Sequence, residues 1–240
     1  MKKKIILIII VAIFITIIIY TISRNDKKIF LALGDSIALG KLSNEEINYS
    51  FNDYIANYMN KRDILNKFNK DFTESGMRTT DLINMIRNNE RNENNNITIQ
   101  QALAKADYIT ISIGSYDLFN RLGITNGGER ARNNYELNRY FLSKFTDLNE
   151  LLKLIKKYTT ARVVVIGFYN PVIDPDDELV EIFKFIDEAY RIIAQRNNCE
   201  YVSLEKINSN EEYISDTRNT LINAKAHEFI GQMIIELLKF

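Results

Sequence analysis

The sequence predicts an α/β domain built on a parallel sheet, and two observations support this fold class. Short apolar runs typical of buried strands alternate with longer segments whose apolar residues recur at helical spacing. Four of the nine glycines, Gly34, Gly76, Gly114 and Gly167, fall at or near the ends of expected strands. Tight strand-to-helix turns use glycine in any case, but a site shared at the carboxyl edge of the sheet would need the same residues there.

The expected elements follow one another in strict alternation. Apolar and β-branched runs predict strands at residues 29–34, 64–72, 108–113, 163–166 and 200–204. Helical periodicity predicts helices at residues 45–60, 79–87, 135–158, 179–194 and 225–238. Two polar stretches, 88–96 and 120–134, are expected to be a solvated loop and a lid or loop. Since no repeat or internal linker interrupts the pattern, residues 29–240 are predicted to form one domain.

Asp35 and Ser36 follow directly after Gly34, the last residue of the first apolar run at 29–34. Working groups in open α/β sheets lie beyond the carboxyl ends of the strands, so Ser36 is placed as a nucleophile would be. If a helix starts there, the Ser36 backbone N–H points into the same space and can stabilise an oxyanion. A serine that simply caps the helix would give the same local pattern.

Composition excludes several classes of function. The 31 basic and 31 acidic residues balance, so no basic excess points to nucleic acid. Cys199 is the single cysteine and is expected to be a small core residue. His227 is the single histidine, so any mechanism that needs an imidazole depends on it. No metal-binding, Walker or dinucleotide motif is present, and we therefore expect neither a metal nor a cofactor.

The N-terminal segment predicts a membrane anchor. Residues 5–22 carry no charge, are rich in isoleucine and are long enough to cross a bilayer. The flank that follows has neither a small-residue cleavage pattern nor a cysteine for lipidation, which favours an uncleaved signal anchor. We expect residues 1–4 to be a cytoplasmic tail, 23–28 a linker, and the domain to be extracytoplasmic. Lysines and arginines flank the segment on both sides, so a cytoplasmic, membrane-tethered domain is the alternative.

Five separated blocks resemble the SGNH/GDSL esterase and lipase family, in the same order and over essentially all of residues 29–240. The blocks are Leu33-Gly34-Asp35-Ser36, Ser75-Gly76, Ile111-Ser112-Ile113-Gly114-Ser115-Tyr116-Asp117-Leu118, Val165-Ile166-Gly167-Phe168-Tyr169-Asn170-Pro171 and Asn223-Ala224-Lys225-Ala226-His227. The resemblance implies a flavodoxin-like, three-layer α/β/α fold. It also implies hydrolysis of carboxylic esters, such as acyl lipids or acetylated glycans, through an acyl-enzyme on Ser36. The N–H groups of Ser36 and Gly76 would then be oxyanion donors.

The chain departs from the family pattern at the catalytic positions. The oxyanion asparagine of the family falls at Tyr116. If Asn223 matches the asparagine of the family's last block, the catalytic histidine falls at Leu221 and the aspartate at Arg218. A serine without its base loses on the order of a million-fold in turnover, so weak or absent activity is expected.

Replacement groups are few. His227 lies six positions beyond Leu221 and would need a local shift to act as the base; Asp216 would need a remodelled loop. Tyr116 or Ser115 could offer a hydroxyl to the oxyanion. The alternatives to an esterase are a non-catalytic module that binds an acylated, glycan or protein partner at the cell surface, and a scaffold whose pocket is filled by side chains such as Tyr116.

Overall fold

The structure is a computed structural model that describes residues 13, 14, 16, 27–42, 46–92, 96–125, 134–214 and 220–240. Most of the predicted anchor at residues 5–22 and of the linker at 23–28 therefore lies outside the described residues, and so does Asp216. Among the helices that the structure describes, none combines the length and the apolar character needed to cross a bilayer.

Five parallel strands form the central sheet in the order β2-β1-β5-β6-β7. They are β1 (Lys28–Gly34), β2 (Leu65–Thr73), β5 (Tyr108–Ser112), β6 (Arg162–Ile166) and β7 (Glu200–Val202). Counted along the chain, this is the 2-1-3-4-5 order of flavodoxin-like sheets, whose ligands bind where the order reverses. That point lies between β1 and β5, so the residues after β1 occupy the expected place for a site.

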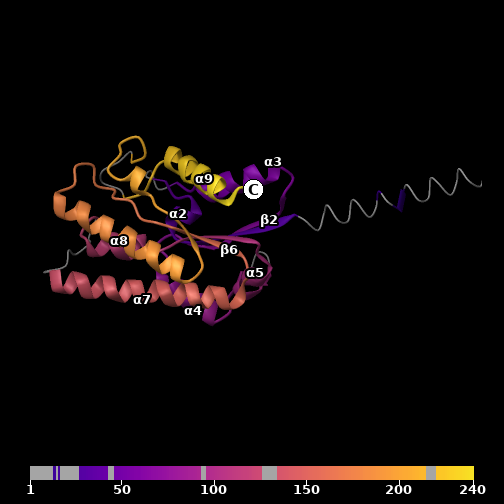
Figure 1. Cartoon of the computed structure of the whole chain (residues 1–240), viewed down its shortest axis with the longest axis horizontal. Helices are drawn as coiled ribbons and strands as arrows, with labels where there is room; N and C mark the ends of the chain where they lie inside the picture. The colour runs from indigo at the N-terminus through magenta and orange to yellow at the C-terminus, as the bar shows by residue number, and fades with distance from the viewer. Residues whose placement is uncertain are drawn as a thin grey trace, which may run out of the picture.

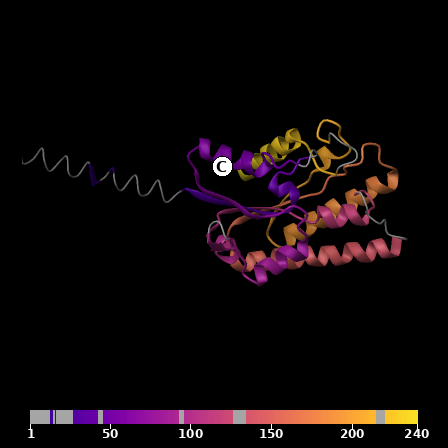
Figure 2. The same cartoon turned by 180° about the vertical axis from the view of Figure 1, so that it is seen from behind.

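Helices cover both faces of the sheet, which confirms the predicted three-layer α/β/α class (Figures 1 and 2). On one face α3 (Phe51–Lys61) packs against α9 (Ala224–Leu238). On the other, α7 (Asn134–Tyr158) packs between α4 (Thr79–Arg87) and α8 (Asp177–Arg196). The C-terminal end of the chain lies beside α3 in Figure 1.

Strand β1 is buried on both faces, as its continuous apolar run predicts. Phe30, Leu31, Ala32 and Leu33 are completely enclosed. The register places Gly34 opposite Thr73 of β2 and Ser112 of β5, so all three strands end at the same level. The loops that follow them meet at this edge of the sheet.

Helix α3 begins later than the periodicity predicts, at Phe51 rather than at residue 45. Ser50 is the N-cap: its hydroxyl accepts from the Asp53 N–H, while the Asp53 carboxylate accepts from the Ser50 N–H at 2.9 Å. This capping box fixes the start of the helix. Ile47, which carries the helical spacing further back, instead pairs with Lys41 as an isolated bridge.

Several short elements fall where the sequence pattern predicts none. They are α2 (Ser36–Leu39), the antiparallel pair β3 (Arg91–Asn92) and β4 (Ile97–Thr98), α5 (Ile99–Lys105), α6 (Ser115–Arg121) and the 3-10 turn η1 (Glu205–Ile207). Each spans seven residues or fewer, which is too short for a clear periodic signal. The stretch predicted as a lid or loop at 120–134 starts inside α6, and its residues 126–133 lie outside the described residues.

Candidate active site

Ser36 is the first residue of α2 and lies directly beyond the carboxyl end of β1. Asp35 is the N-cap of this short helix, and its carboxylate accepts from the Ile37 N–H at 3.1 Å. The first N–H groups of a helix have no intrahelical partner, so the Ser36 N–H can act as a hydrogen-bond donor to a ligand. The structure places Ser36 as the sequence predicts.

A second donor approaches Ser36 from the loop after β2. The Gly76 N–H donates to the Ser36 Oγ at 3.1 Å, and the Ser75 hydroxyl lies 3.2 Å from the same oxygen. Gly76 adopts a φ of +79°, in the left-handed region that glycine tolerates best, and this conformation turns its N–H toward Ser36. Two of the predicted oxyanion donors, the Ser36 and Gly76 N–H groups, thus lie on the two segments that meet at the Ser36 hydroxyl.

Asp35, the residue before Ser36, holds the nucleophile turn in place through hydrogen bonds to β5 and α6. Its carboxylate is fully buried and accepts from the Ser115 hydroxyl at 2.5 Å and the Ser112 hydroxyl at 3.2 Å. Burial raises the pKa of Asp35, and the hydrogen bonds from Ser115, Ile37 and Ser112 offset part of that shift. Asp35 therefore ties the nucleophile turn to the end of β5 and the start of α6, which makes it a positioning residue.

Tyr116 lies in α6, two residues after Gly114. Its side chain is 43% exposed, so it does not fill a buried pocket. The guanidinium of Arg78 lies over the Tyr116 ring, 5.3 Å from the ring centroid. Arg78 is the residue before α4 and belongs to the same loop as Gly76.

Asp117, the residue after Tyr116, is buried and contacts Arg78. Its carboxylate oxygens lie 3.6 Å from Arg78 Nε and 3.7 Å from Lys144 Nζ, and its carbonyl accepts from the Tyr140 hydroxyl at 2.8 Å. Burial raises the pKa of Asp117, while the positive charges of Lys144 and Arg78 lower it. Asp117 thus helps to hold Arg78 next to the start of α6.

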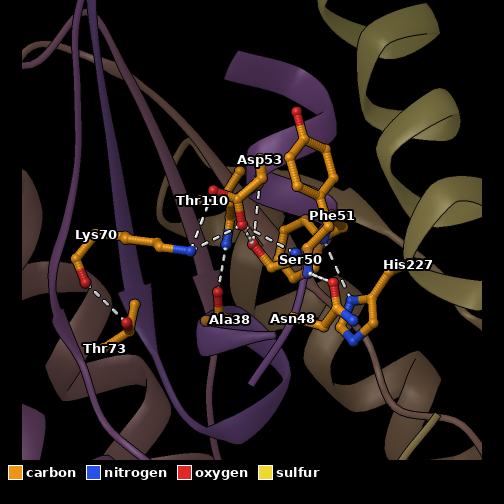
Figure 3. Close-up of polar contacts among 11 residues, drawn as sticks. Ala38, Asn48, Ser50, Phe51, Asp53, Lys70, Thr73, Thr110 and His227 are labelled. Carbon is orange, nitrogen blue, oxygen red and sulfur yellow. Dashed lines mark hydrogen bonds and ion pairs between the residues drawn. The ribbon is translucent and has the colours of Figure 1, made fainter. Parts of the chain in front are cut away.

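His227 belongs to α9, and its side chain is buried against α3 with no exposed surface. Its Nδ1 accepts from the Phe51 N–H at 3.3 Å, and its ring stacks on the Phe51 ring (Figure 3). Burial lowers the pKa of His227 to about 4, so the ring is neutral at pH 7. No hydrogen bond joins His227 to Ser36 in the described part of the chain.

Figure 3 also shows the polar network that holds the start of α3. Lys70 of β2 pairs with the Asp53 carboxylate at 2.8 Å, and Asp53 accepts from the Ser50 hydroxyl at 2.6 Å. Deeper in the core, the Asn52 amide donates to the Ala38 carbonyl at 2.9 Å and accepts from the Thr110 hydroxyl at 2.6 Å. These contacts fasten α2, the helix of the nucleophile, to α3 and β5.

Candidate metal ligands are absent from the ranges that the structure covers: no three histidine, cysteine or acidic side chains gather closely enough to hold an ion there. Cys199 is buried, and burial raises the pKa of its thiol to about 11. The protonated thiol is a small core group, as the sequence predicts.

The topology, together with a serine held at the reversal point and contacted by a neighbouring backbone N–H, identifies the SGNH class of hydrolase folds. The chain belongs to the GDSL-like lipase/acylhydrolase family, whose model matches residues 32–227. This match covers the whole distance from β1 to α9 and confirms the resemblance found in the sequence.

Solved structures support the same fold. The chain is similar to a lipase from a goat rumen metagenome, with a TM-score of 0.67, 20% sequence identity and coverage of 88% of this chain and 97% of that one. It is also similar to an acetylxylan esterase from Geobacillus stearothermophilus, with a TM-score of 0.61, 14% identity and coverage of 89% and 94%. Among curated proteins, no match is found.

Sequence reasoning missed the partners that hold the site. Ser112 and Ser115 lie inside a block that carries the resemblance, yet nothing in the sequence indicates that both contact Asp35. Arg78 follows Gly76 by two residues, and its exposed position resembles any surface arginine. Only the fold brings it to Tyr116.

Proposed function

We propose that the chain is a serine ester hydrolase of slow turnover that forms an acyl-enzyme on Ser36. The observation that carries this proposal is the 3.1 Å hydrogen bond from the Gly76 N–H to the Ser36 Oγ, at the reversal point of the sheet. A carbonyl carbon that approaches Ser36 would bring its oxygen between the N–H groups of Ser36 and Gly76, where negative charge develops during attack.

The reaction would proceed in two steps. The Ser36 Oγ forms a bond to the ester carbonyl carbon while its proton passes to solvent water, and the tetrahedral oxyanion accepts hydrogen bonds from the Ser36 and Gly76 N–H groups. Collapse of this intermediate breaks the bond to the alkoxide, which takes up a proton from solvent and leaves as the alcohol, so an ester remains on Ser36. Water then attacks this acyl-enzyme and releases the carboxylic acid.

The rate of attack by Ser36 depends on a general base that accepts the proton of its hydroxyl. The two candidates that the sequence offers are His227, which is enclosed between α3 and α9, and Asp216, which lies outside the described residues. Since no described side chain that could act as a base contacts the Ser36 hydroxyl, the serine would react mainly through the oxyanion donors and proximity, which alone retain about a thousand-fold or more over water in comparable enzymes. We therefore expect slow turnover. The acetylxylan esterase among the similar structures favours acetyl esters of glycans as the substrates to test first.

The test is covalent labelling of the full-length chain, in detergent micelles, with a fluorophosphonate probe. We expect labelling that is lost in Ser36→Ala and kept in Ser143→Ala, which changes an exposed serine of α7. Hydrolysis of p-nitrophenyl acetate should show the same dependence on Ser36. A folded chain that takes up no probe would contradict the esterase proposal.

A non-catalytic binding module is the second candidate. It is favoured by one observation: neither a histidine nor a carboxylate donates to or accepts from the Ser36 hydroxyl within the described residues. On this proposal the surface around Ser36 and Gly76 would bind an acylated glycan without cleaving it. Saturable binding of an acetylated xylo-oligosaccharide, lost in Gly76→Trp and unaccompanied by product, would support the module over the enzyme.

We also propose that residues 5–22 anchor the domain in the cell membrane, with a cytoplasmic N-terminus and an extracytoplasmic domain. The proposal depends on the uncharged, isoleucine-rich run of 18 residues. The full-length chain should stay with membranes after alkaline carbonate extraction, whereas a chain that lacks residues 2–24 should not. Protease added outside spheroplasts should degrade the domain; protection from it would favour the opposite orientation.

A further inference from the structure

We propose that Arg78 supplies the oxyanion donor that an asparagine supplies in related enzymes, and that Tyr116 serves to hold it. This inference deepens the proposed function, since it assigns the third donor of the same site. The resemblance places the family's asparagine at position 116, where this chain has Tyr116, and the guanidinium of Arg78 lies over the Tyr116 ring.

The first step is the position of Arg78 between two segments that flank the nucleophile. The loop of Gly76 and Arg78 reaches Ser36 through the Gly76 N–H, at 3.1 Å from Oγ. The start of α6 reaches the neighbouring Asp35 through the Ser115 hydroxyl, at 2.5 Å. Arg78 belongs to the first segment and contacts Tyr116 in the second, so it bridges the two segments that meet beside Ser36.

The second step is the way in which Arg78 is held. Its guanidinium lies 5.3 Å from the centroid of the Tyr116 ring, and its Nε lies 3.6 Å from the Asp117 carboxylate. Lys144 approaches the other oxygen of Asp117 at 3.7 Å, so that carboxylate is shared between two cations. A guanidinium that lies over an aromatic ring and forms an ion pair through Nε has less conformational freedom than an unsupported surface arginine.

The third step is that the guanidinium keeps free donors. The Arg78 side chain is 49% exposed. Among the described residues it makes the Asp117 ion pair and the Tyr116 contact, but its terminal nitrogens donate no hydrogen bond. Two terminal NH2 groups therefore remain available to a ligand, and they form charge-assisted bonds with an oxyanion or a carboxylate that are stronger than those of a neutral amide.

The alternative role for Tyr116 is direct donation from its hydroxyl, and two conservative variants separate the two roles. Tyr116→Phe keeps the ring under Arg78 and removes only the hydroxyl. Arg78→Met keeps much of the side-chain volume and removes the donors. If Arg78 is the donor, Tyr116→Phe should keep the rate of fluorophosphonate labelling within about three-fold, while Arg78→Met should lower it about a hundred-fold.

Arg62 provides a matched control, because its guanidinium lies over the Tyr58 ring at 5.2 Å, an equivalent contact at the end of α3. Arg62→Met should leave the labelling rate unchanged. Arg78→Lys restores a charge without the planar fork and should be intermediate. Tyr116→Asn in the Arg78→Met background should recover part of the loss, since it restores the family's own donor.

A readout that needs no turnover keeps this inference separate from the esterase proposal. In the Ser36→Ala chain, titration with sodium acetate should shift the amide resonance of Gly76 in a saturable way, since acetate is the carboxylate product of the proposed reaction. Arg78→Met should weaken this binding at least five-fold, and Arg62→Met should not.

The outcomes are distinct. A wild-type chain that takes up no probe but binds acetate through Arg78 would end the esterase proposal and support Arg78 only as a hydrogen-bond donor to a carboxylate bound beside Ser36. Equal labelling and equal acetate binding in the Arg78→Met and Arg62→Met chains would overturn the assignment. A hundred-fold loss in Tyr116→Phe would transfer the donor role to the tyrosine hydroxyl. Arg78→Lys and Tyr116→Phe still decide the question if Arg78→Met fails to fold.

Discussion

Gly34 and Ser112 approach each other so closely that a methyl group on Gly34 would lie 1.8 Å from the Ser112 carbonyl oxygen. Gly34 also has a φ of +128°, which side chains rarely adopt. The same carbonyl accepts from the Asp35 N–H at 2.8 Å. The end of β1 thus packs against β5 at Gly34, two residues before the nucleophile Ser36, and no residue larger than glycine fits there.

Gly34→Ala is expected to cost about 3 kcal/mol or more of the free energy of unfolding, because backbone, not a movable side chain, fills the space. Gly76→Ala is the control: its φ is also positive, but nothing lies within 4 Å of the added methyl, so the cost should be about 1 kcal/mol. Urea denaturation followed by circular dichroism measures both. Equal losses would mean that the close approach at Gly34 relaxes freely.

Asn52→Ala is expected to destabilise the chain by about 3 kcal/mol, since it leaves the Ala38 carbonyl and the Thr110 hydroxyl without partners in the core. Thr110→Val removes one of these bonds and should cost about 1 kcal/mol. The double variant should lose less than the sum, because the two side chains share a hydrogen bond. Labelling of Ser36 should also slow in Asn52→Ala, as α2 loses its tie to α3; additive losses with unchanged labelling would argue against this positioning role.

The burial of His227 predicts a pH dependence of stability. The folded chain keeps the ring neutral down to a pKa of about 4, whereas the unfolded chain binds a proton near pH 6.5. The unfolded state therefore gains protons as the pH falls from 6.5 to 4, and the free energy of unfolding should decrease by about 3 kcal/mol over that interval. Above pH 6.5 the contribution is fully present.

His227→Asn isolates this effect, because the asparagine oxygen can still accept from the Phe51 N–H. Urea titrations at pH 7.5, 5.5 and 4.5 should show a smaller loss of stability on acidification in the variant than in the wild type, while carboxylates contribute equally to both. Parallel curves would show that His227 does not remain neutral in the folded chain.

The identity of the base can be tested at Asp216 and His227 separately. His227 is enclosed and accepts from Phe51, so we expect His227→Asn to label with fluorophosphonate within about three-fold of the wild-type rate. Asp216→Asn is the informative change, since a loss of ten-fold or more would identify a carboxylate base. A large loss in folded His227→Asn would instead require that α9 shifts to bring the ring to Ser36.

Much of the fold could be predicted because its strands are long enough to show a pattern. The run from Phe30 to Leu33 marks a strand buried on both faces, and helices such as α7 bury a repeating apolar stripe. The start of α3 could not be placed, because the capping box of Ser50 and Asp53 overrides a helical spacing that continues to Ile47. Local hydrogen bonds, not periodicity, decide where such a helix begins.

Some residues of the candidate site could be predicted from the sequence, and others could not. Ser36 and Gly76 could be found because each follows a strand whose end is marked in the sequence. Arg78 and Tyr116 are 38 positions apart, and only the pairing of β1 with both β2 and β5 brings their loops together. A residue type with no unusual neighbours in sequence gives no signal of such a contact.

Strand β1 begins at Lys28, where the N-terminal segment joins the domain, and ends at Gly34, two residues before Ser36. The attachment point of the N-terminal segment and the nucleophile therefore lie at opposite ends of one seven-residue strand. At roughly 3.3 Å per residue the strand holds them about 23 Å apart. If the proposed anchor tethers the domain, strand β1 would keep Ser36 at a distance from the membrane surface. Ser36 would work in a layer above the bilayer, out of contact with the lipids of its own membrane, and would meet polymers that extend through that layer.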